Sequence, residues 1–184
     1  MLPTNLASML PTAEEFHDFA RSQVAWITNC LADGDHDEWT PQMMVQVFDP
    51  KDGSKSLEIL SLHVPFNSDD EKRLAMTSLA TNLYFRQKIP LMACLSSEGW
   101  QSMNTPKGMR PADDPFRKEV VILFGMTVHH LSCVTSAPIS RPAGKIVASE
   151  FGDLRTENVR TQLLQQFFAA FMRPIAHKFQ DASH

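Results

Sequence analysis

The feature that most constrains the fold is a short turn between two apolar runs. The segment from Asp49 to Gly53 separates Met43–Phe48 from Leu57–Val64 and reads DPKDG. Proline presets φ at an early turn position, aspartate side chains bond to nearby backbone groups, and glycine accepts a positive φ. Two apolar runs joined by such a turn predict a β-hairpin, whose strands are antiparallel. The chain is therefore expected to contain an antiparallel sheet.

Three helices are predicted from their start signals. The segments from Thr12 to Glu15 and from Ser68 to Glu71 both have the capping-box pattern, in which a hydroxyl and a glutamate three residues later bond to each other's backbone N–H groups. Apolar residues recur at helical spacing after both segments, and again after Thr156. Pro174 is expected to kink or end this last helix. Its many aromatic residues make Phe168 and Met172 candidates for a dimer contact or a peptide groove.

The remaining apolar runs predict strands. Ile89–Leu95 and Val120–Phe124 are almost continuously apolar, which is typical of central strands. Leu131–Ile139 and Lys145–Phe151 flank a turn of sequence RPAG and predict a last pair. The expected order is α-β-β-α-β-β-β-β-α. Most of the predicted strands follow one another directly in the sequence. This order favours an α+β fold with a mainly antiparallel sheet of five or six strands and three helices gathered on one face.

Length, charge and cysteine usage narrow the class of protein. The 184 residues suit a single domain, residues 1–184, and residues 1–11 are expected to form a flexible N-terminal arm. A net charge of -4 argues against broad nucleic-acid binding. Cys30, Cys94 and Cys133 form no C-x-x-C pair, which indicates a reducing compartment. No apolar stretch approaches the ~18–20 residues that span a bilayer. We expect a cytoplasmic protein without a membrane partner.

The first candidate site lies between the two predicted central strands. Its members are Ser97, Glu98, Trp100, Arg117 and Glu119. Counting inward from both strands of an antiparallel pair places Glu98 near Arg117, which predicts an ion pair covered by Trp100. One interpretation is structural: the pair fastens the base of a hairpin. The other makes Glu98, Asp113 and Asp114 a carboxylate site for a metal ion or a general base.

These residues resemble the motifs of an uncharacterised family of small bacterial and phage proteins. The family motifs are a strand-end Ser-Glu-Ala-Trp and a later Pro-rich loop that returns as Asp-Arg-x-Glu. In this chain the matching residues are Ser97, Glu98, Trp100, Pro111, Pro115, Arg117 and Glu119. Gly99 replaces the alanine, and Phe116 stands where the family has aspartate. The resemblance covers about half the chain, residues 37–121, and implies a shared fold and an origin in phages or other mobile elements. It implies no activity.

Histidine offers a second route to a metal site. Zinc accepts mixed nitrogen and oxygen ligands, so His63, Glu98 and either His129 or His130 are compatible with a site across the sheet. His129 and His130 are adjacent on a strand and point to opposite faces, so they do not chelate one ion together. The alternative interpretation is that these histidines are solvated or satisfied within the core. The zinc-binding pattern H-E-x-x-H is absent.

The common catalytic motifs are also missing. The chain has no G-x-S-x-G, G-x-x-x-x-G-K-[ST] or G-x-G-x-x-G, and Cys94 lies within an apolar strand, where a reactive thiolate is disfavoured. The sequence favours a non-catalytic binding or accessory protein without a cofactor, whose partner is another protein or a second copy of itself. The alternative is a metal-assisted hydrolase that uses Glu98 with His63 or His129. Nucleic-acid binding would require several basic residues to converge: Arg110, Arg117, Lys118, Arg141 and Lys145.

Overall fold

A computed structural model describes residues 9–32, 36–62, 68–102, 113–156, 159 and 161–181, with the backbone alone at 61 and 174–181. The elements are α1 (Ala13–Ala32), β1 (Gln42–Phe48), β2 (Lys55–Ser61), α2 (Asp69–Phe85), β3 (Ile89–Gln101), β4 (Lys118–Thr127), β5 (Ser132–Ser140), a 3₁₀ turn η3 (Pro142–Gly144), β6 (Val147–Ala148) and α3 (Gln162–Asp181). The predicted α+β class and the predicted element order are confirmed.

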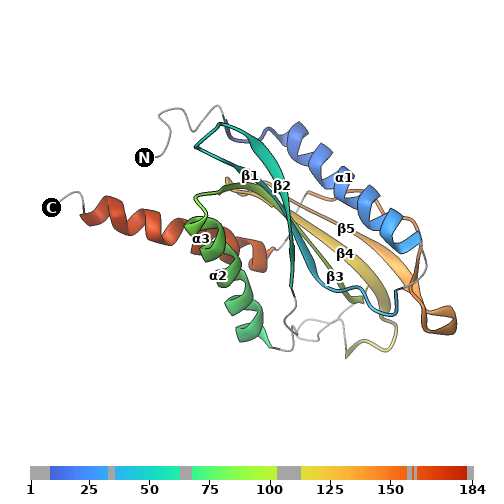
Figure 1. Cartoon of the computed structure of the whole chain (residues 1–184). Coiled ribbons are helices and arrows are strands. Elements are labelled where there is room, and N and C mark those ends of the chain that lie inside the picture. The colour runs from blue at the N-terminus through green and yellow to red at the C-terminus, as the bar shows by residue number, and fades with distance from the viewer. Residues whose placement is uncertain are drawn as a thin grey trace.

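The strands form one antiparallel sheet in the order β2-β1-β3-β4-β5-β6 (Figure 1). The predicted hairpin joins β1 to β2. At its turn the Asp49 N–H donates to the Ser54 carbonyl at 2.9 Å, and Gly53 has a φ of 75°. Glycine accepts this positive φ without the steric penalty that a side chain would bring. The apolar strands β3 and β4 lie at the centre of the sheet, as their composition predicts.

The helices cover both faces of the sheet, so the expectation that they gather on one face is wrong (Figure 1). On one face, α1 packs through Phe16 and Ile27 against a core that includes Met44 and Cys94. On the other face, α2 and α3 pack on a second core. Successive residues of a strand point to opposite faces. The continuous apolar runs of β1 and β3 therefore supply side chains to both cores.

Both predicted capping boxes form. Thr12 N–H donates to Glu15 at 2.7 Å, and Glu15 N–H donates to the Thr12 hydroxyl at 3.1 Å. The bond from the Thr12 N–H lowers the pKa of the Glu15 carboxyl. Ser68 and Glu71 make the same reciprocal bonds at the start of α2. These local bonds fix where two of the three helices begin.

The last helix differs from its prediction at two points. It begins at Gln162 rather than near Thr156, because Arg155 pairs as an antiparallel bridge with Val134 beside β5. Its backbone stays helical through Pro174 to Asp181. Phe168 is only 2 % exposed, so it belongs to the core and is not available for the predicted dimer contact or peptide groove, whereas Met172 is 45 % exposed.

Some predictions fall on residues outside the described ranges. The second strand ends at Ser61, and His63 lies beyond the described part. Residues 1–8 of the predicted arm and residues 103–112 of the long loop are also outside it. Among the helices that the structure describes, none is long and apolar enough to cross a membrane.

Candidate functional site

The predicted site lies at one end of the two central strands. In the β3–β4 register Glu98 is opposite Val121, and Trp100 is opposite Glu119. Directly opposed residues share a face, so Glu98, Trp100 and Glu119 lie on the face that α1 covers. Ser97 points to the other face by the alternation of a strand. The structure therefore brings two acids and an indole together and leaves Ser97 out.

The guanidinium that binds Glu98 belongs to Arg141, which follows β5. Its Nη2 lies 2.6 Å from one oxygen of Glu98 and 2.9 Å from one oxygen of Glu119. Hydrogen bonding to Glu119 and the charge of Glu98 raise the pKa of Arg141. Arg141 also donates to the backbone carbonyl of Asp37, and the Asp37 carboxylate lies 2.9 Å from Nζ of Lys145. Arg141, at the end of β5, therefore links β3 and β4 to the segment before β1.

Trp39 completes the surroundings of Glu98. Its backbone N–H donates to the Glu98 oxygen that Arg141 leaves unbound, and its indole N–H donates to the Ser96 hydroxyl at 3.1 Å. Ser96 lies on the same face of β3 as Glu98, two residues before it. Trp39 is 4 % exposed, and its ring packs edge-on to Trp26 of α1 at 6.1 Å. Both oxygens of Glu98 therefore accept hydrogen bonds within the fold.

The predicted Glu98–Arg117 ion pair is not formed. Both strands run farther than predicted, so the ladder continues to Gln101 opposite Lys118 before Arg117 is reached. Four residues of strand, ~13 Å, then separate the level of Arg117 from that of Glu98. Arg117 instead stacks on Trp100, with its Cζ 4.6 Å from the ring centroid.

The two aspartates before β4 do not join Glu98. Asp114 is 7 % exposed, accepts from the Ser102 hydroxyl, and accepts from the Phe116 N–H at 2.8 Å. These two hydrogen bonds lower its pKa, and they close the turn that leads into β4. Asp113 is exposed. Within the described ranges, no group of three His, Cys, Asp or Glu side chains is placed to hold a metal ion.

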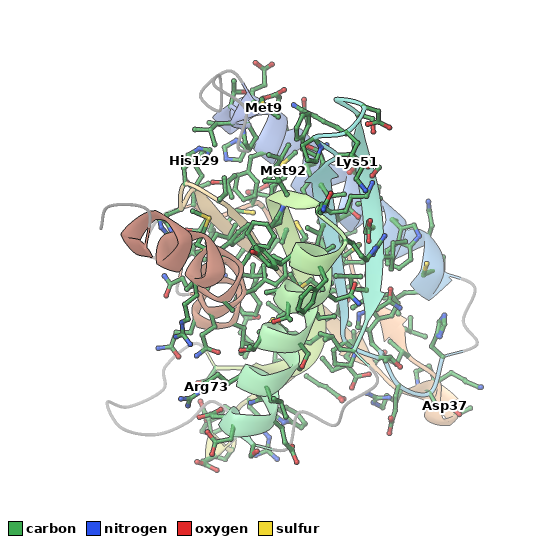
Figure 2. The ribbon with its side chains drawn as sticks, turned by 60° about the vertical axis from the view of Figure 1, so that its left-hand side comes forward. Met9, Asp37, Lys51, Arg73, Met92 and His129 are labelled. Carbon is green, nitrogen blue, oxygen red and sulfur yellow. The ribbon has the colours of Figure 1, made fainter. Side chains whose placement is uncertain are left out.

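The histidine candidates are not gathered around Glu98. His129 is exposed in the turn after β4, beyond the pair Met92–Thr127. That pair is six residues from the Glu98 level, which corresponds to ~20 Å of strand. Figure 2 shows His129 and Asp37, whose carbonyl binds Arg141, at opposite ends of the molecule. A site shared by Glu98 and His129 is therefore not formed, while His63 lies outside the described residues.

The two buried thiols are held in their neutral form. Cys94 and Cys133 are fully buried beneath α1. Burial raises the pKa of Cys133 to about 11, and burial also raises the pKa of Cys94 well above its usual range. Because the thiolate is the reactive form of cysteine, neither side chain is activated as a nucleophile. The prediction that Cys94 is buried is confirmed.

A pocket that the sequence did not reveal lies on the opposite face of the sheet. Its volume is about 370 Å³, and its lining residues are Leu95, Phe124, Thr161, Gln162, Leu163 and Leu164. It opens between the first turn of α3 and strands β3 and β4. Leucine and phenylalanine side chains form its walls, and Thr161 and Gln162 add polar groups from one side. Known small-molecule sites are mostly apolar clefts with a few polar groups, and their volumes start at ~300 Å³.

A buried acceptor without a partner lies on α3, one turn after two of the residues that line the pocket. The side-chain oxygen of Gln166 is the one buried side-chain polar atom in the described part of the chain that has no hydrogen-bond partner. Gln166 follows Gln162 by four residues and Leu163 by three, so it lies on the same side of the helix. An unsatisfied buried oxygen costs ~1–3 kcal/mol. A ligand that donates a hydrogen bond would remove this penalty.

The comparisons with known proteins add no relative. No family model, no curated protein and no solved structure matches the chain. The resemblance of Ser97, Glu98, Trp100 and the residues before β4 to an uncharacterised bacterial and phage family therefore stays a prediction from short motifs.

Proposed function

We propose that this protein is a non-catalytic binding protein whose ligand is a small apolar molecule with one hydrogen-bond donor. The observation that carries the proposal is the pocket of about 370 Å³ between α3 and strands β3 and β4. Its volume lies near the lower end of the range for small-molecule sites. It suits one or two fused aromatic rings rather than a long chain.

The lining explains the expected preference for an apolar body. Leu95 and Leu164 are 2 % and 1 % exposed, so the pocket reaches into the core of this face. Apolar area removed from water contributes ~25 cal/mol per Å². An aromatic ring placed against Phe124 would gain this term and an additional contact between rings.

The hydrogen-bond donor expected on the ligand follows from polar groups on α3 and just before it. Gln166 has a buried, unpaired oxygen, and Thr161 and Gln162 add polar atoms to the pocket lining. A ligand N–H or O–H group that reached Gln166 would satisfy the acceptor. A matching donor would then improve affinity by the net value of one hydrogen bond, ~0.5–1.5 kcal/mol.

The groups considered for catalysis support a non-catalytic role. Both oxygens of Glu98 accept from Arg141 and Trp39, and Asp114 closes a turn. A general base or a metal ligand needs a free lone pair directed at the reactant. Glu98 also lies on the opposite face of the sheet from the pocket.

The test uses two probes of the same shape. Indole carries an N–H donor, whereas benzofuran has an oxygen at that position and no donor. Calorimetry should show binding of both to the full chain, with indole tighter by about 2- to 12-fold, which corresponds to one net hydrogen bond. Native mass spectrometry of untreated protein should show a retained small molecule.

Two leucine variants provide a matched pair. Leu163 and Leu79 are both partly buried against the same core, but only Leu163 lines the pocket. Leu163→Trp should fill the pocket and abolish binding of both probes, and Leu79→Trp should leave binding unchanged. Absence of binding to the unmodified protein, or an equal loss in both variants, would contradict the proposal.

A further inference from the structure

The strand at one edge of the sheet has a long border with no described neighbour. β2 has seven residues and pairs with β1 on one side only. The opposite edge is different, because it ends in the two-residue strand β6, and Gly152 and Arg155 continue the bonds to β5. Edge strands are usually protected by proline, bulges or charged side chains, and the two charged side chains of β2 are held by ion pairs, Lys55 with Glu15 and Glu58 with Arg86. β2 contains neither proline nor glycine, and its pairing with β1 has no bulge.

The hydrogen-bond pattern shows which groups of β2 point outward. The Asp49 N–H donates to Ser54 at 2.9 Å, and the Leu62 N–H donates to Pro41 at 3.1 Å. Hydrogen-bonded pairs alternate along an antiparallel ladder, so the even-numbered residues of β2 bond to β1. The N–H and C=O groups that point away from the sheet belong to Lys55, Leu57, Ile59 and Ser61. No hydrogen bond joins them to another described backbone group.

The outward residues also carry exposed apolar side chains. Leu57 and Ile59 are each 50 % exposed. They lie opposite Gln46 and Met44, on the face that carries α1. That helix packs mainly over β3, β4 and β6 (Figure 1), and it approaches β2 at its first turn, where Glu15 lies 4.0 Å from Nζ of Lys55. β2 therefore combines backbone groups that have no partner in the described part of the chain with two adjacent apolar side chains on one face.

We propose that β2 forms a homodimer by antiparallel pairing with β2 of a second copy across a two-fold axis at Glu58. In this register Leu57 lies opposite Ile59 of the second copy, and Lys55 lies opposite Ser61. All four outward residues then form hydrogen-bonded pairs. A shift by two residues in either direction leaves an outward residue at one end of β2 without a partner on the strand.

Charge and symmetry favour a second copy as the occupant. At the axis the two Glu58 side chains meet on the face that carries α2. Like charges at opposed positions destabilise a sheet, but each Glu58 is held by Arg86 with bonds of 2.5 and 2.8 Å. Two Glu58–Arg86 ion pairs therefore meet at the axis, and together they carry no net charge. The four apolar side chains form one contiguous patch, and a two-fold contact of this kind is closed.

The pairing is independent of the proposed pocket, which lies at α3. One pair of strands covers less than a standard interface of ~1,600 Å², so the dimer should dissociate on dilution. Analytical ultracentrifugation of the full chain should show a monomer–dimer equilibrium. Ile59→Pro removes an N–H that does not bond to β1, and Leu57→Lys places a charge in the apolar patch. Both should yield monomer with an unchanged melting temperature.

Val147→Lys is the matched control, because Val147 is a 48 % exposed apolar residue on the opposite edge strand. This variant should still dimerise, as should Leu163→Trp in the pocket. A protein that stays monomeric at every concentration, or a dimer that only Val147→Lys disrupts, would overturn the pairing. Open-ended higher oligomers would overturn the closed two-fold arrangement.

Disulfide trapping tests the register without relying on a disruptive variant. Residues opposed in a non-hydrogen-bonded pair have Cα atoms ~4.5 Å apart, within the range that a disulfide spans. In a Cys30→Ser background, Glu58→Cys should cross-link to a dimer under mild oxidation. Ser56→Cys should not, because Ser56 lies opposite Leu60 of the second copy. Cross-linking of Ser56→Cys alone would overturn the proposed axis.

Discussion

Nη2 of Arg141 lies 2.6 Å from Oε2 of Glu98, although 43 positions separate the two residues in the sequence. The same guanidinium binds Glu119 on the neighbouring strand. The three side chains are about one quarter exposed, at 26 %, 24 % and 27 %. Arg141 therefore holds two acids at the end of the central strands, where they would otherwise repel each other.

This contact predicts strong coupling between Glu98 and Arg141. Arg141→Ala leaves Glu98 and Glu119 without their cation, and should lower the free energy of unfolding by ~1–3 kcal/mol. Glu98→Ala should have a smaller effect, because Arg141 keeps Glu119. The double variant should lose less than the sum, by ~0.5–3 kcal/mol. Urea denaturation of the four proteins measures this difference.

Arg117 provides the control for this cycle. It stacks on Trp100 and makes no ion pair with Glu98. Glu98→Ala and Arg117→Ala should therefore add to within ~0.5 kcal/mol. Coupling of Glu98 to Arg117 that exceeded its coupling to Arg141 would contradict the observed geometry.

The sequence predicted those features that depend on neighbouring residues. The capping boxes at Thr12 and Ser68, and the turn from Asp49 to Gly53, each use bonds within a few residues. Their residue types identify them without knowledge of the rest of the fold. The order of elements follows from such signals together with the apolar runs.

The site depended on information that local patterns do not carry. The partner of Glu98 is set by the length of β3 and β4 and by the place where β5 ends. Arg141 occupies the predicted last turn, which was a usable signal, because β5 pairs with β4 and returns the chain to the end of the sheet near Glu119. The pocket could be predicted only if the packing angle between α3 and the sheet were known. No residue pattern in the sequence specifies that angle.

A second prediction concerns the close approach of α1 to β4 at Gly125. A Cβ added there would lie 2.7 Å from Sγ of Cys133 and 3.1 Å from the Phe16 ring. Both neighbours are fully buried, so neither has free space to move into. Gly125→Ala should lower the free energy of unfolding by ~1–3 kcal/mol, and Cys133→Ala in the same chain should recover part of this loss.

Gly152→Ala is the matched control for Gly125→Ala. The nearest atom to its added Cβ would be the Ser136 carbonyl oxygen at 3.8 Å, an ordinary contact. Thermal denaturation should show little change for Gly152→Ala. Equal destabilisation by the two glycine substitutions would mean that the gap beneath α1 is not tight.

The buried thiols predict a loss of stability at alkaline pH. The raised pKa of Cys133, about 11, keeps its thiol protonated in the fold, whereas unfolded thiols ionise near ~8.5. Between these values the unfolded chain binds fewer protons than the native chain. The free energy of unfolding should therefore fall as pH rises, by up to ~1.4 kcal/mol per pH unit for each such thiol.

Denaturant titrations from pH 7 to 11 measure this slope. Cys133→Ala should be flatter than the unmodified chain over the same range, because one of the ionising groups has been removed. Comparison of the two proteins cancels the contribution of lysine and tyrosine ionisation. Identical slopes would show that the Cys133 thiol ionises equally in the native and unfolded states.

The last prediction separates the role of Gln166 in stability from its role in binding. Gln166→Met keeps a side chain of similar length but removes the buried, unpaired oxygen. The free energy of unfolding without ligand should rise by ~1–3 kcal/mol, because the acceptor is no longer buried without a partner. The same variant should bind indole and benzofuran equally, since the group that distinguishes them is gone. Gln165→Met, at an exposed neighbouring position, should alter stability by less than ~0.5 kcal/mol and should keep the preference for indole. A preference for indole that survived Gln166→Met would place the donor-binding group elsewhere in the pocket.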